Sequence, residues 1–389
     1  MGAKDYVIEV SADWRAVRAD EWNELLGAQA APTPFMRHEY LQALTTSASA
    51  VNETGWGLRV LTLRQDGRLH AACPLYLKAH SWGEYVFDHA WAQAYEQHGL
   101  RYYPKLLAAV PFTPATGTRL LARDEDARSA LIAALVSLAT RSALSSTHAL
   151  FVDSLDGAAF AQAGWMLRET VQFHWVNRKP AAYADFDDFL QDLRRDKRRK
   201  IVQERRRVAD SGISFEIHVG AAIDPDAWDF FYRCHEQTYA VRGQAPYLTR
   251  AFFDAMANDL PGHWVMFIAQ RAGVRVAASL IAIDADQRLA WGRYWGCVED
   301  IACLHFEACY YQPLTWCIAQ GYLRFEGGAQ GSHKMARGLL PVRTHSAHWL
   351  ADPRFAQAVD DFLARETQGV EAWMDELESH QPFKPPPGP

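Results

Sequence analysis

The sequence lacks a hydrophobic run long enough to cross a membrane. Its longest apolar run, residues 130–139, is about half the length that a transmembrane helix needs. The first residues, MGAKDYVIEV, contain no apolar stretch of the kind found in secretory signals, and Tyr6 stands where a myristoylation motif has Ser or Thr. We therefore expect no transmembrane segment and a cytoplasmic location.

Cysteines are few, and familiar catalytic motifs are missing. Of the six cysteines, Cys297, Cys303, Cys309 and Cys317 fall in or beside one predicted helix, at spacings that match no zinc motif. We interpret them as small hydrophobic residues in a reducing compartment, and we predict no metal site. The chain has no P-loop, no GxSxG, no HExxH and no GxGxxG after a predicted strand, so the enzyme classes that depend on these motifs are not indicated.

The chain also lacks a strong excess of charge of either sign. A net charge of -6 and a pI near 6.2 argue against a general nucleic-acid coat, although a local basic patch can exist on an acidic protein. With 389 residues, 49% of them hydrophobic, the chain can bury two ordinary cores.

The order of predicted elements in the first half recurs in the second. A hairpin pattern with an Asp66-Gly67 turn, VLTLRQDGRLHAACPLYLK, is matched by VMFIAQRAGVRVAASLIAI, and each is followed by strand, helix and strand. We predict two α/β domains with mixed, largely antiparallel sheets, at residues 1–180 and 181–380, and a disordered tail at 381–389. Residues 89–99 have no clear period and are predicted to form a loop.

A basic helix is predicted over residues 189–210. Lys197 lies on its apolar stripe between Leu193 and Ile201, so we expect its ammonium to face an anion, either an internal carboxylate or the phosphate of a ligand. Arg198 and the other basic residues of the helix spread around the remaining faces, where a solvated surface is the simpler interpretation.

A second helix, predicted over residues 304–320, carries an acidic residue on its apolar stripe. Glu307 falls one turn from Leu304 and from Tyr311. Burial there raises the pKa of a carboxyl unless a cation such as Arg293 or Lys334 lies nearby. A structural ion pair and a role as general base or substrate ligand both remain open.

The stretch FEGGAQGSHKMARGLLPVRTHSAHW, residues 325–349, mixes glycines with polar and apolar residues immediately after a predicted strand. Its glycines permit turns and close approach of a ligand. We interpret residues 326–334 as the base of a site, with Glu326, Gln330 and His333 as substrate-binding residues; Arg293 is predicted to bind substrate as well. Lys334 could hold a phosphate, stabilise an oxyanion or pair with Glu307 or Glu326. His345 and His348 would point to opposite faces of a strand and make a poor metal pair.

In the first half, Tyr103 and Lys105 stand among apolar residues near Thr113 and Arg119. They could form a wall that faces a ligand. A plain core with a lysine whose stem is buried explains the pattern equally well.

Five segments, in order along the chain, are similar to those of one known family. They are YYPKLLAAVPFTPATGTRLL, LRRDKRRKIVQERRRV, GRYWG, LHFEACYYQ and FEGGAQGSHKMARGLLPV. The chain resembles the FemAB-like predicted N-acyltransferases, described as peptidoglycan biosynthesis or recognition proteins. The resemblance implies two tandem domains of the GNAT acyltransferase fold and places Lys334 where the wider Fem superfamily has a lysine implicated in the site. The Q/R-x-x-G-x-G/A loop that binds the CoA pyrophosphate in GNAT enzymes is not found.

The leading hypothesis is an N-acyltransferase without a permanently bound cofactor. Its donor would be an acyl-CoA or an aminoacyl-tRNA, and its acceptor an amine, including that of a peptidoglycan precursor. Glu307 would act as base and Lys334 would stabilise the oxyanion, while Lys197, Arg198 and Lys105 would hold phosphates. Two alternatives remain: a non-catalytic module that binds a peptidoglycan precursor or a phosphorylated amine, and an RNA binder that uses the basic helix. The sequence assigns no oligomeric state.

Overall fold

The computed structural model describes residues 5–329 and 331–385, which form two compact units. Unit 1 consists of Met1–Thr170, Tyr247–Phe252 and Arg343–Ala372, and unit 2 consists of Val171–Pro246, Phe253–Val342 and Trp373–Pro389. This division differs from the expected domains 1–180 and 181–380, because two segments of the second half pack with the first. Within the described residues, no helix combines the length and the apolar character needed to cross a bilayer.

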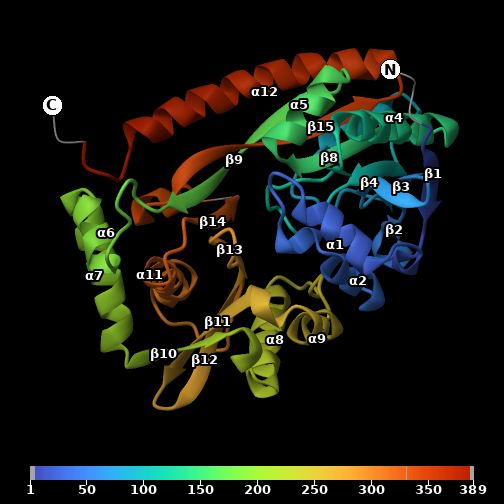
Figure 1. The fold of residues 1–389 in the computed structure, drawn as a ribbon. Helices are drawn as coiled ribbons and strands as arrows, with labels where there is room; N and C mark the ends of the chain where they lie inside the picture. Colours follow the sequence, from blue (N-terminus) through green and yellow to red (C-terminus); the bar gives the residue numbers. More distant parts are fainter. Residues whose placement is uncertain (1–4, 330, 386–389) are drawn as a thin grey trace. The chain divides into compact units, whose positions relative to one another are not determined.

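Unit 1 contains two sheets with helices around them (Figure 1). One sheet has the strand order β1-β3-β4-β7, and the other includes the order β15-β8-β6-β5-β2. The elements that lie wholly in unit 1 are β1 (Val7–Ser11), α1 (Ala19–Gly27), α2 (His38–Thr46), β2 (Trp56–Leu58), β3 (Val60–Gln65), β4 (Arg68–Cys73), β5 (Tyr76–Lys78), α3 (His89–Gln97), β6 (Lys105–Ala108), β7 (Leu121–Ala122), α4 (Glu125–Arg141), β8 (Ser146–Val152) and α5 (Ser154–Gln162).

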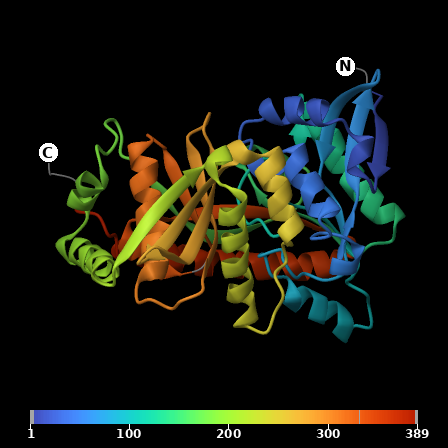
Figure 2. The ribbon, with the colours of Figure 1, turned by 90° about the horizontal axis from the view of Figure 1, so that it is seen from below.

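Unit 2 is built on a sheet with the order β10-β11-β12-β13-β14-β9. The strands β10 to β13 are antiparallel, β13 and β14 are parallel, and β14 is antiparallel to β9. The helix α8 packs against β12 and β13 of this sheet (Figure 2). Its elements are α6 (Phe186–Asp192), α7 (Arg195–Asp210), β10 (Ile213–Val219), α8 (Pro225–Ala240), β11 (Trp264–Arg271), β12 (Val274–Asp284), β13 (Leu289–Cys297), α10 (Leu304–Phe306), a π-helical turn (Glu307–Tyr311), α11 (Gln312–Ala319), β14 (Arg324–Ala329) and a 3₁₀ helix (Ser332–Arg337).

Four elements contain residues of both units: β9 (Met166–Val176), α9 (Arg250–Asp259), β15 (Leu340–Leu350) and α12 (Pro353–Ser379). The mixed, largely antiparallel sheets and the helices that cover them confirm the predicted α/β fold class. Both predicted hairpins form, as the pairs β3–β4 and β11–β12. Strand β11 is buried from Trp264 to Ala269, as expected of a strand covered on both faces.

Two predictions of local structure are wrong. Residues 89–97 form the helix α3 instead of a loop, and its buried residues are Trp91 and Tyr95, which lie one turn apart. The expected basic helix 189–210 is interrupted at Leu193 and Arg194, whose backbone is extended or nearly so.

The interruption has a partner in the tail. Arg194 N donates to Pro382 O at 2.8 Å, and Lys384 N donates to Asp192 O at 2.8 Å. Residues 381–385 are therefore ordered against the α6–α7 junction, which corrects the expectation of a disordered tail for this part; residues 386–389 lie outside the described residues. The junction contains no glycine or proline that would end a helix. Hydrogen bonds to the tail, and not low helix propensity, therefore end the helix there.

Candidate functional site

The strands β13 and β14 diverge in unit 2. Their parallel pairing covers only three positions and ends at Trp291 and Glu326. The register between β12 and β13 shifts at Arg293, and the register between β14 and β9 shifts after Glu326. A bulge bends its strand and interrupts the ladder. Such irregularities lie just beyond the parallel pairing, between β12 and β13 and between β14 and β9, so β13 and β14 separate there.

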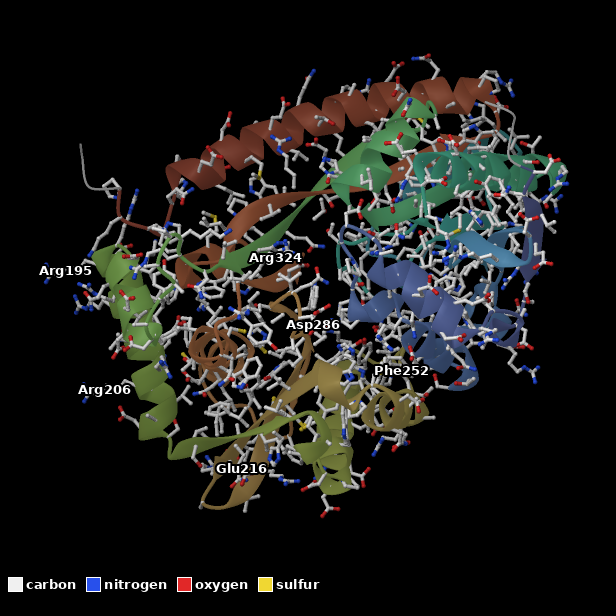
Figure 3. The ribbon with its side chains drawn as sticks, in the orientation of Figure 1. Arg195, Arg206, Glu216, Phe252, Asp286 and Arg324 are labelled. Carbon is white, nitrogen blue, oxygen red and sulfur yellow. The ribbon has the colours of Figure 1, made fainter. Side chains whose placement is uncertain are left out.

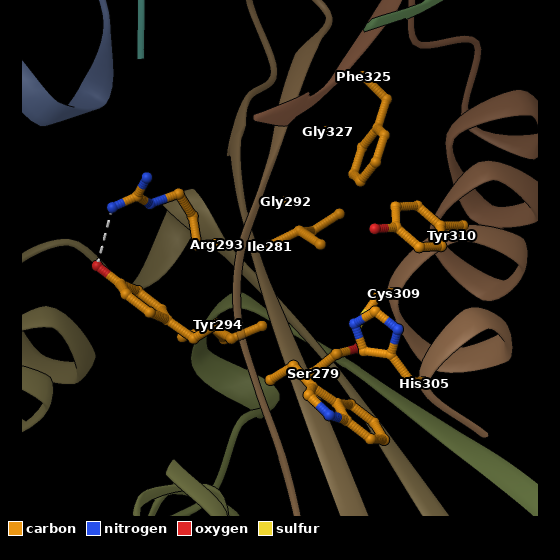
Figure 4. Close-up of a pocket in the computed structure, with 12 residues that line it drawn as sticks. Ser279, Ile281, Gly292, Arg293, Tyr294, His305, Cys309, Tyr310, Phe325 and Gly327 are labelled. Carbon is orange, nitrogen blue, oxygen red and sulfur yellow. Dashed lines mark hydrogen bonds between the residues drawn. The ribbon is translucent and has the colours of Figure 1, made fainter. Parts of the chain in front are cut away.

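A cavity of about 150 Å³ lies where these strands part (Figure 4). Figure 4 shows Arg293 and Tyr294 on one side of β13, joined by a hydrogen bond of 3.2 Å, and His305, Tyr310 and Phe325 on the other side. The remaining lining residues come from β12, β13, β14 and the helix that follows β13; they are Ser279, Leu280, Ile281, Gly292, Trp295, Cys309 and Gly327.

Arg293 brings a positive charge to the cavity lining, whereas burial keeps three other lining groups neutral near pH 7. Burial lowers the pKa of His305 to about 4, so its imidazole is unprotonated. Burial raises the pKa of Tyr310 and of Cys309, so both keep their protons. Ser279 donates to Ala308 O at 2.6 Å. The cavity therefore offers protonated hydroxyl and thiol groups, one neutral imidazole and the guanidinium of Arg293 to a bound group.

Lys334 lies behind one wall of the cavity. Its Nζ donates to Gly327 O at 2.7 Å and to Gly328 O at 3.3 Å, and only 6% of the residue is exposed. The 3₁₀ helix Ser332–Arg337 returns the chain so that the lysine stem lies against Gly327, where an added Cβ would be 2.4 Å from Leu339 Cδ2. Only glycine leaves room for this packing. Burial lowers the pKa of Lys334 to about 8, although Cys309 acts in the opposite direction.

Glu326 is buried beside two basic residues. Arg324 Nη2 lies 3.0 Å from its Oε1, and His174 Nε2 lies 3.8 Å from its Oε2. Burial lowers the pKa of His174 to about 3, with Arg324 and Lys334 adding to the shift, so the imidazole is neutral. Glu326 thus lies next to the cavity wall, one residue before Gly327, and does not itself line the cavity; its predicted role in substrate binding stays a prediction.

Glu307 is buried as predicted, but it does not line the cavity. Its Oε1 accepts from Gln312 Nε2 at 2.8 Å and from Arg205 Nε at 3.2 Å. Burial raises its pKa, and Arg205 and Gln312 oppose that shift. The carboxylate therefore lies against α7, and the structure does not bring it to the groups that surround the cavity.

The structure corrects the predicted orientation of Lys197. Its side chain is one-third exposed and pairs with the adjacent Asp196 at 3.1 Å, instead of pointing into the core. Arg198 donates to Gln191 at 2.8 Å. An outer ridge of α7 is formed by exposed basic residues, and Figure 3 shows Arg195 and Arg206 directed away from the body of unit 2.

Tyr103 and Lys105 belong to unit 1 and do not join this cavity. Lys105 is fully buried and contacts Glu84 at 2.8 Å and Asp88. Two carboxylates already neutralise its charge, so the geometry gives no support to a phosphate-binding role. The hydroxyl of Tyr103 lies 2.8 Å from Ser81 Oγ.

The remaining predicted residues have mixed positions. Arg293 lines the cavity mouth, whereas His333 is exposed, with its ring near those of Phe306 and Tyr310. Gln330 lies outside the described residues. In residues 5–329 and 331–385, no group of His, Cys, Asp and Glu side chains could hold a metal ion.

Sequence reasoning missed several lining residues. Ser279 stands in an apolar strand, and Tyr310 and Cys309 stand in an apolar helix, so each is hidden in a pattern typical of core residues. The structure itself marks this region: the π-helical turn Glu307–Tyr311 interrupts the helix at the cavity, and such turns are frequent at functional sites.

The FemAB-like family model, described as peptidoglycan biosynthesis/recognition, matches residues 13–385. The chain belongs to the FemAB-like family. No curated protein sequence matches this FemAB-like chain.

Three solved structures resemble the FemAB-like chain in fold. One is FemX, with a TM-score of 0.54, 10% identity, and coverage of 90% of this chain and 100% of that chain. Another is the C-terminal domain of a putative lysylphosphatidylglycerol synthetase from Agrobacterium fabrum, with a TM-score of 0.53, 12% identity and coverage of 88% and 94%. The third is L-PGS from Bacillus licheniformis, with a TM-score of 0.53, 10% identity and coverage of 89% and 97%. At these identities the likeness concerns the fold.

Proposed function

We propose that the protein is an N-acyltransferase whose acyl-transfer centre is the cavity between β13 and β14 of unit 2. The observation that carries this proposal is the cavity itself. It begins where the parallel pairing ends, is enclosed on one side by protonated side chains, and has the buried ammonium of Lys334 behind Gly327. Membership of the FemAB-like family supports a transferase in peptidoglycan synthesis or recognition.

The chemistry is the transfer of an acyl group from an activated ester to an amine. The amine nitrogen attacks the carbonyl carbon, a C–N bond forms, and the C–O bond of the ester breaks. Negative charge develops on the carbonyl oxygen in the transition state. We assign its stabilisation to Lys334, whose ammonium does not line the cavity but donates to the carbonyl of the lining residue Gly327. The proton lost by the amine ends on the departing oxygen. Tyr310 lines the cavity and keeps its own proton, and its proposed role is to donate a hydrogen bond to that oxygen.

An aminoacyl-tRNA suits the protein better than acyl-CoA as donor. The turn between β13 and the next helix, where GNAT enzymes hold the CoA pyrophosphate, has the sequence VEDIAC and carries Glu299 and Asp300. Asp300 there opposes a pyrophosphate, while the charge of Glu299 is already offset by its ion pair with Arg271. Conversely, α7 has eight Lys and Arg against three Asp and Glu in a chain of net charge -6, and such a ridge attracts a polyanion.

The acceptor we propose is an amine on a peptidoglycan precursor. The printed description of the family supports this class of acceptor. An aminoacyl-tRNA donor would place the reaction in the cytoplasm.

The test is a transfer assay with the purified full-length chain. Labelled aminoacyl-tRNAs and acetyl-CoA are offered as donors to a nucleotide-sugar peptide that carries a free amine, and the amide product is identified by mass spectrometry. We expect product from an aminoacyl-tRNA and none from acetyl-CoA. Turnover with acetyl-CoA alone would overturn the donor assignment. Binding of the nucleotide-sugar peptide with no product from any donor would overturn the proposed enzymatic function and favour a non-catalytic binding module.

The same assay tests the role of α7. The double variant Arg195→Gln/Arg199→Gln should weaken tRNA binding about tenfold at low salt and flatten its salt dependence, because each phosphate contact releases counterions. The matched control is Arg354→Gln, since Arg354 is an exposed arginine of α12. Equal effects of the two changes would contradict a specific tRNA surface on α7.

A further inference from the structure

A second, larger cavity lies in unit 1 and takes no part in the proposed transfer. It has a volume of about 560 Å³, within the range of roughly 300 to 1,000 Å³ typical of small-molecule sites. It is lined by α3, by residues 80–82 and by residues 100–103, which directly precede β6. This cavity therefore lies near the N-terminal end of β6.

An exposed aromatic side chain forms part of its wall. Trp82 is 59% exposed, although unpartnered indole rings are usually covered in folded proteins. The backbone of Trp82 is nevertheless fixed, because its N–H donates to His80 Nδ1 at 3.2 Å and its carbonyl accepts from Lys78 Nζ at 3.3 Å. Two hydrogen bonds thus position the backbone of a residue whose exposed indole lines the cavity.

Buried charged residues position a second part of the cavity wall. Ser81 Oγ accepts from Lys105 Nζ at 2.8 Å and donates to Asp88 Oδ1 at 2.5 Å. Tyr102 donates to Asp88 Oδ2 at 2.5 Å, and Tyr103 meets Ser81 Oγ at 2.8 Å. Lys105 and Asp88 therefore position three lining hydroxyl groups without facing the cavity themselves, since neither is among its lining residues.

The cavity wall is polar without a net charge of one sign. Its exposed side chains include Gln93, Glu96 and Arg101, an amide with one acid and one base. Burial, with Lys78 adding to it, lowers the pKa of His80, so this imidazole is neutral near pH 7. A wall of this kind gives little discrimination in favour of an anion or a cation.

The geometry points to a binding site for a neutral saccharide in unit 1. A sugar ring has an apolar face of C–H groups, which would stack on the indole of Trp82, and a rim of hydroxyl groups, which would bond to Gln93, Glu96 and Arg101. Ser81 is buried and bonded to Tyr103, so the hydroxyl of Tyr103 is fixed before binding, which reduces the entropy lost when a ligand binds. Lys105 is a positioning residue of this site.

The experiment is isothermal titration calorimetry of the full chain with tri-N-acetylchitotriose and with cellotriose. We expect saturable binding of at least one trisaccharide. Trp82→Ala should weaken it about tenfold or more, as expected for an aromatic anchor of a binding site. Tyr103→Phe, which keeps the ring and removes the hydroxyl, should weaken it about threefold. Trp373→Ala is the control, since Trp373 is 39% exposed and does not line the cavity.

Three outcomes would overturn the inference. The first is the absence of saturable heat with both trisaccharides, measured on a protein whose thermal unfolding shows that it is folded. The second is an affinity that Trp82→Ala and Trp373→Ala change equally. The third is displacement of the trisaccharide by inorganic phosphate at equimolar concentration, which would identify an anion site. None of these outcomes bears on acyl transfer in unit 2, so the two proposals can fail separately.

Discussion

Each unit buries a lysine, and the two lysines differ in what surrounds the ammonium. In unit 1, burial alone would lower the pKa of Lys105, but Glu84 and Asp88 more than offset it, and the pKa is raised. In unit 2, Lys334 Nζ donates to the carbonyl oxygens of Gly327 and Gly328, and burial lowers its pKa to about 8. One lysine is a fixed structural cation, and the other titrates near neutral pH.

The comparison separates structural from reactive charge. In the buried ion pair of unit 1 the carboxylates offset the charge of the lysine, whereas we propose that the ammonium of Lys334, bonded to carbonyl groups, stabilises a developing anion. Burial by itself does not mark a functional lysine. The groups that surround the ammonium distinguish the structural lysine from the proposed reactive one, and substitutions and pH changes measure this difference.

Replacement of Lys334 should abolish most of the activity and leave the fold intact. We expect Lys334→Met to reduce the single-turnover rate of acyl transfer about 100- to 1,000-fold, as removal of an oxyanion-stabilising group does elsewhere. The control is Lys384→Met, because Lys384 is an exposed lysine of unit 2. Equal rates for the two variants would remove Lys334 from the proposed centre.

Replacement of Lys105 should act on stability. Lys105→Met leaves Glu84 and Asp88 buried without their cation, which costs about 3 to 5 kcal/mol of unfolding free energy. Urea denaturation measures the loss. Lys78→Met is the matched comparison, because Lys78 is also buried and donates to the carbonyl of Trp82, and it should cost about 1 kcal/mol. A loss as small for Lys105 as for Lys78 would contradict the structural role.

The pH dependence of stability should reveal the shifted pKa of Lys334. Its pKa in the folded protein is about 8, below the ordinary 10.5, so between these values the unfolded chain holds the proton more tightly. The stability of the wild type relative to Lys334→Met should therefore rise with pH across that window. A constant difference between the two proteins from pH 7 to pH 10 would show that the pKa is not shifted.

Glu307→Gln should have the smallest effect. Its carboxylate lies against Arg205 and Gln312 and does not line the cavity, so we expect the transfer rate to remain within about threefold of the wild type. Steady-state kinetics on the same substrates give the measurement. A loss as large as that of Lys334→Met would restore Glu307 as the general base.

Much of the fold follows from periodicity and turn chemistry. The two hairpins are signalled by alternating apolar residues around Asp66-Gly67 and Gly273, and α4 and α12 by their helical periods. The break between α6 and α7 could not be predicted, because it depends on hydrogen bonds to residues 382–384, far away in sequence.

The candidate site was predicted only in part. Lys334 and Gly327 could be identified because a charge and glycines directly follow a strand, and Arg293 was named as a partner for Glu307. Sequence reasoning could not show that Glu307 faces α7, since one residue of helical rotation decides which surface it meets, nor that Lys197 is partly exposed beside Asp196. Tyr310 and Ser279 become visible only when the diverging strands open the cavity.

The most direct measurement is the pH profile of the transfer rate for the wild type and for Lys334→Arg. Dividing one rate by the other cancels the titration of the amine acceptor, and arginine stays protonated throughout the range. If the Lys334 cation stabilises the oxyanion, the ratio of wild type to variant falls as pH rises through about 8. A ratio that stays constant from pH 6 to pH 10, or that rises through this range, would contradict the account.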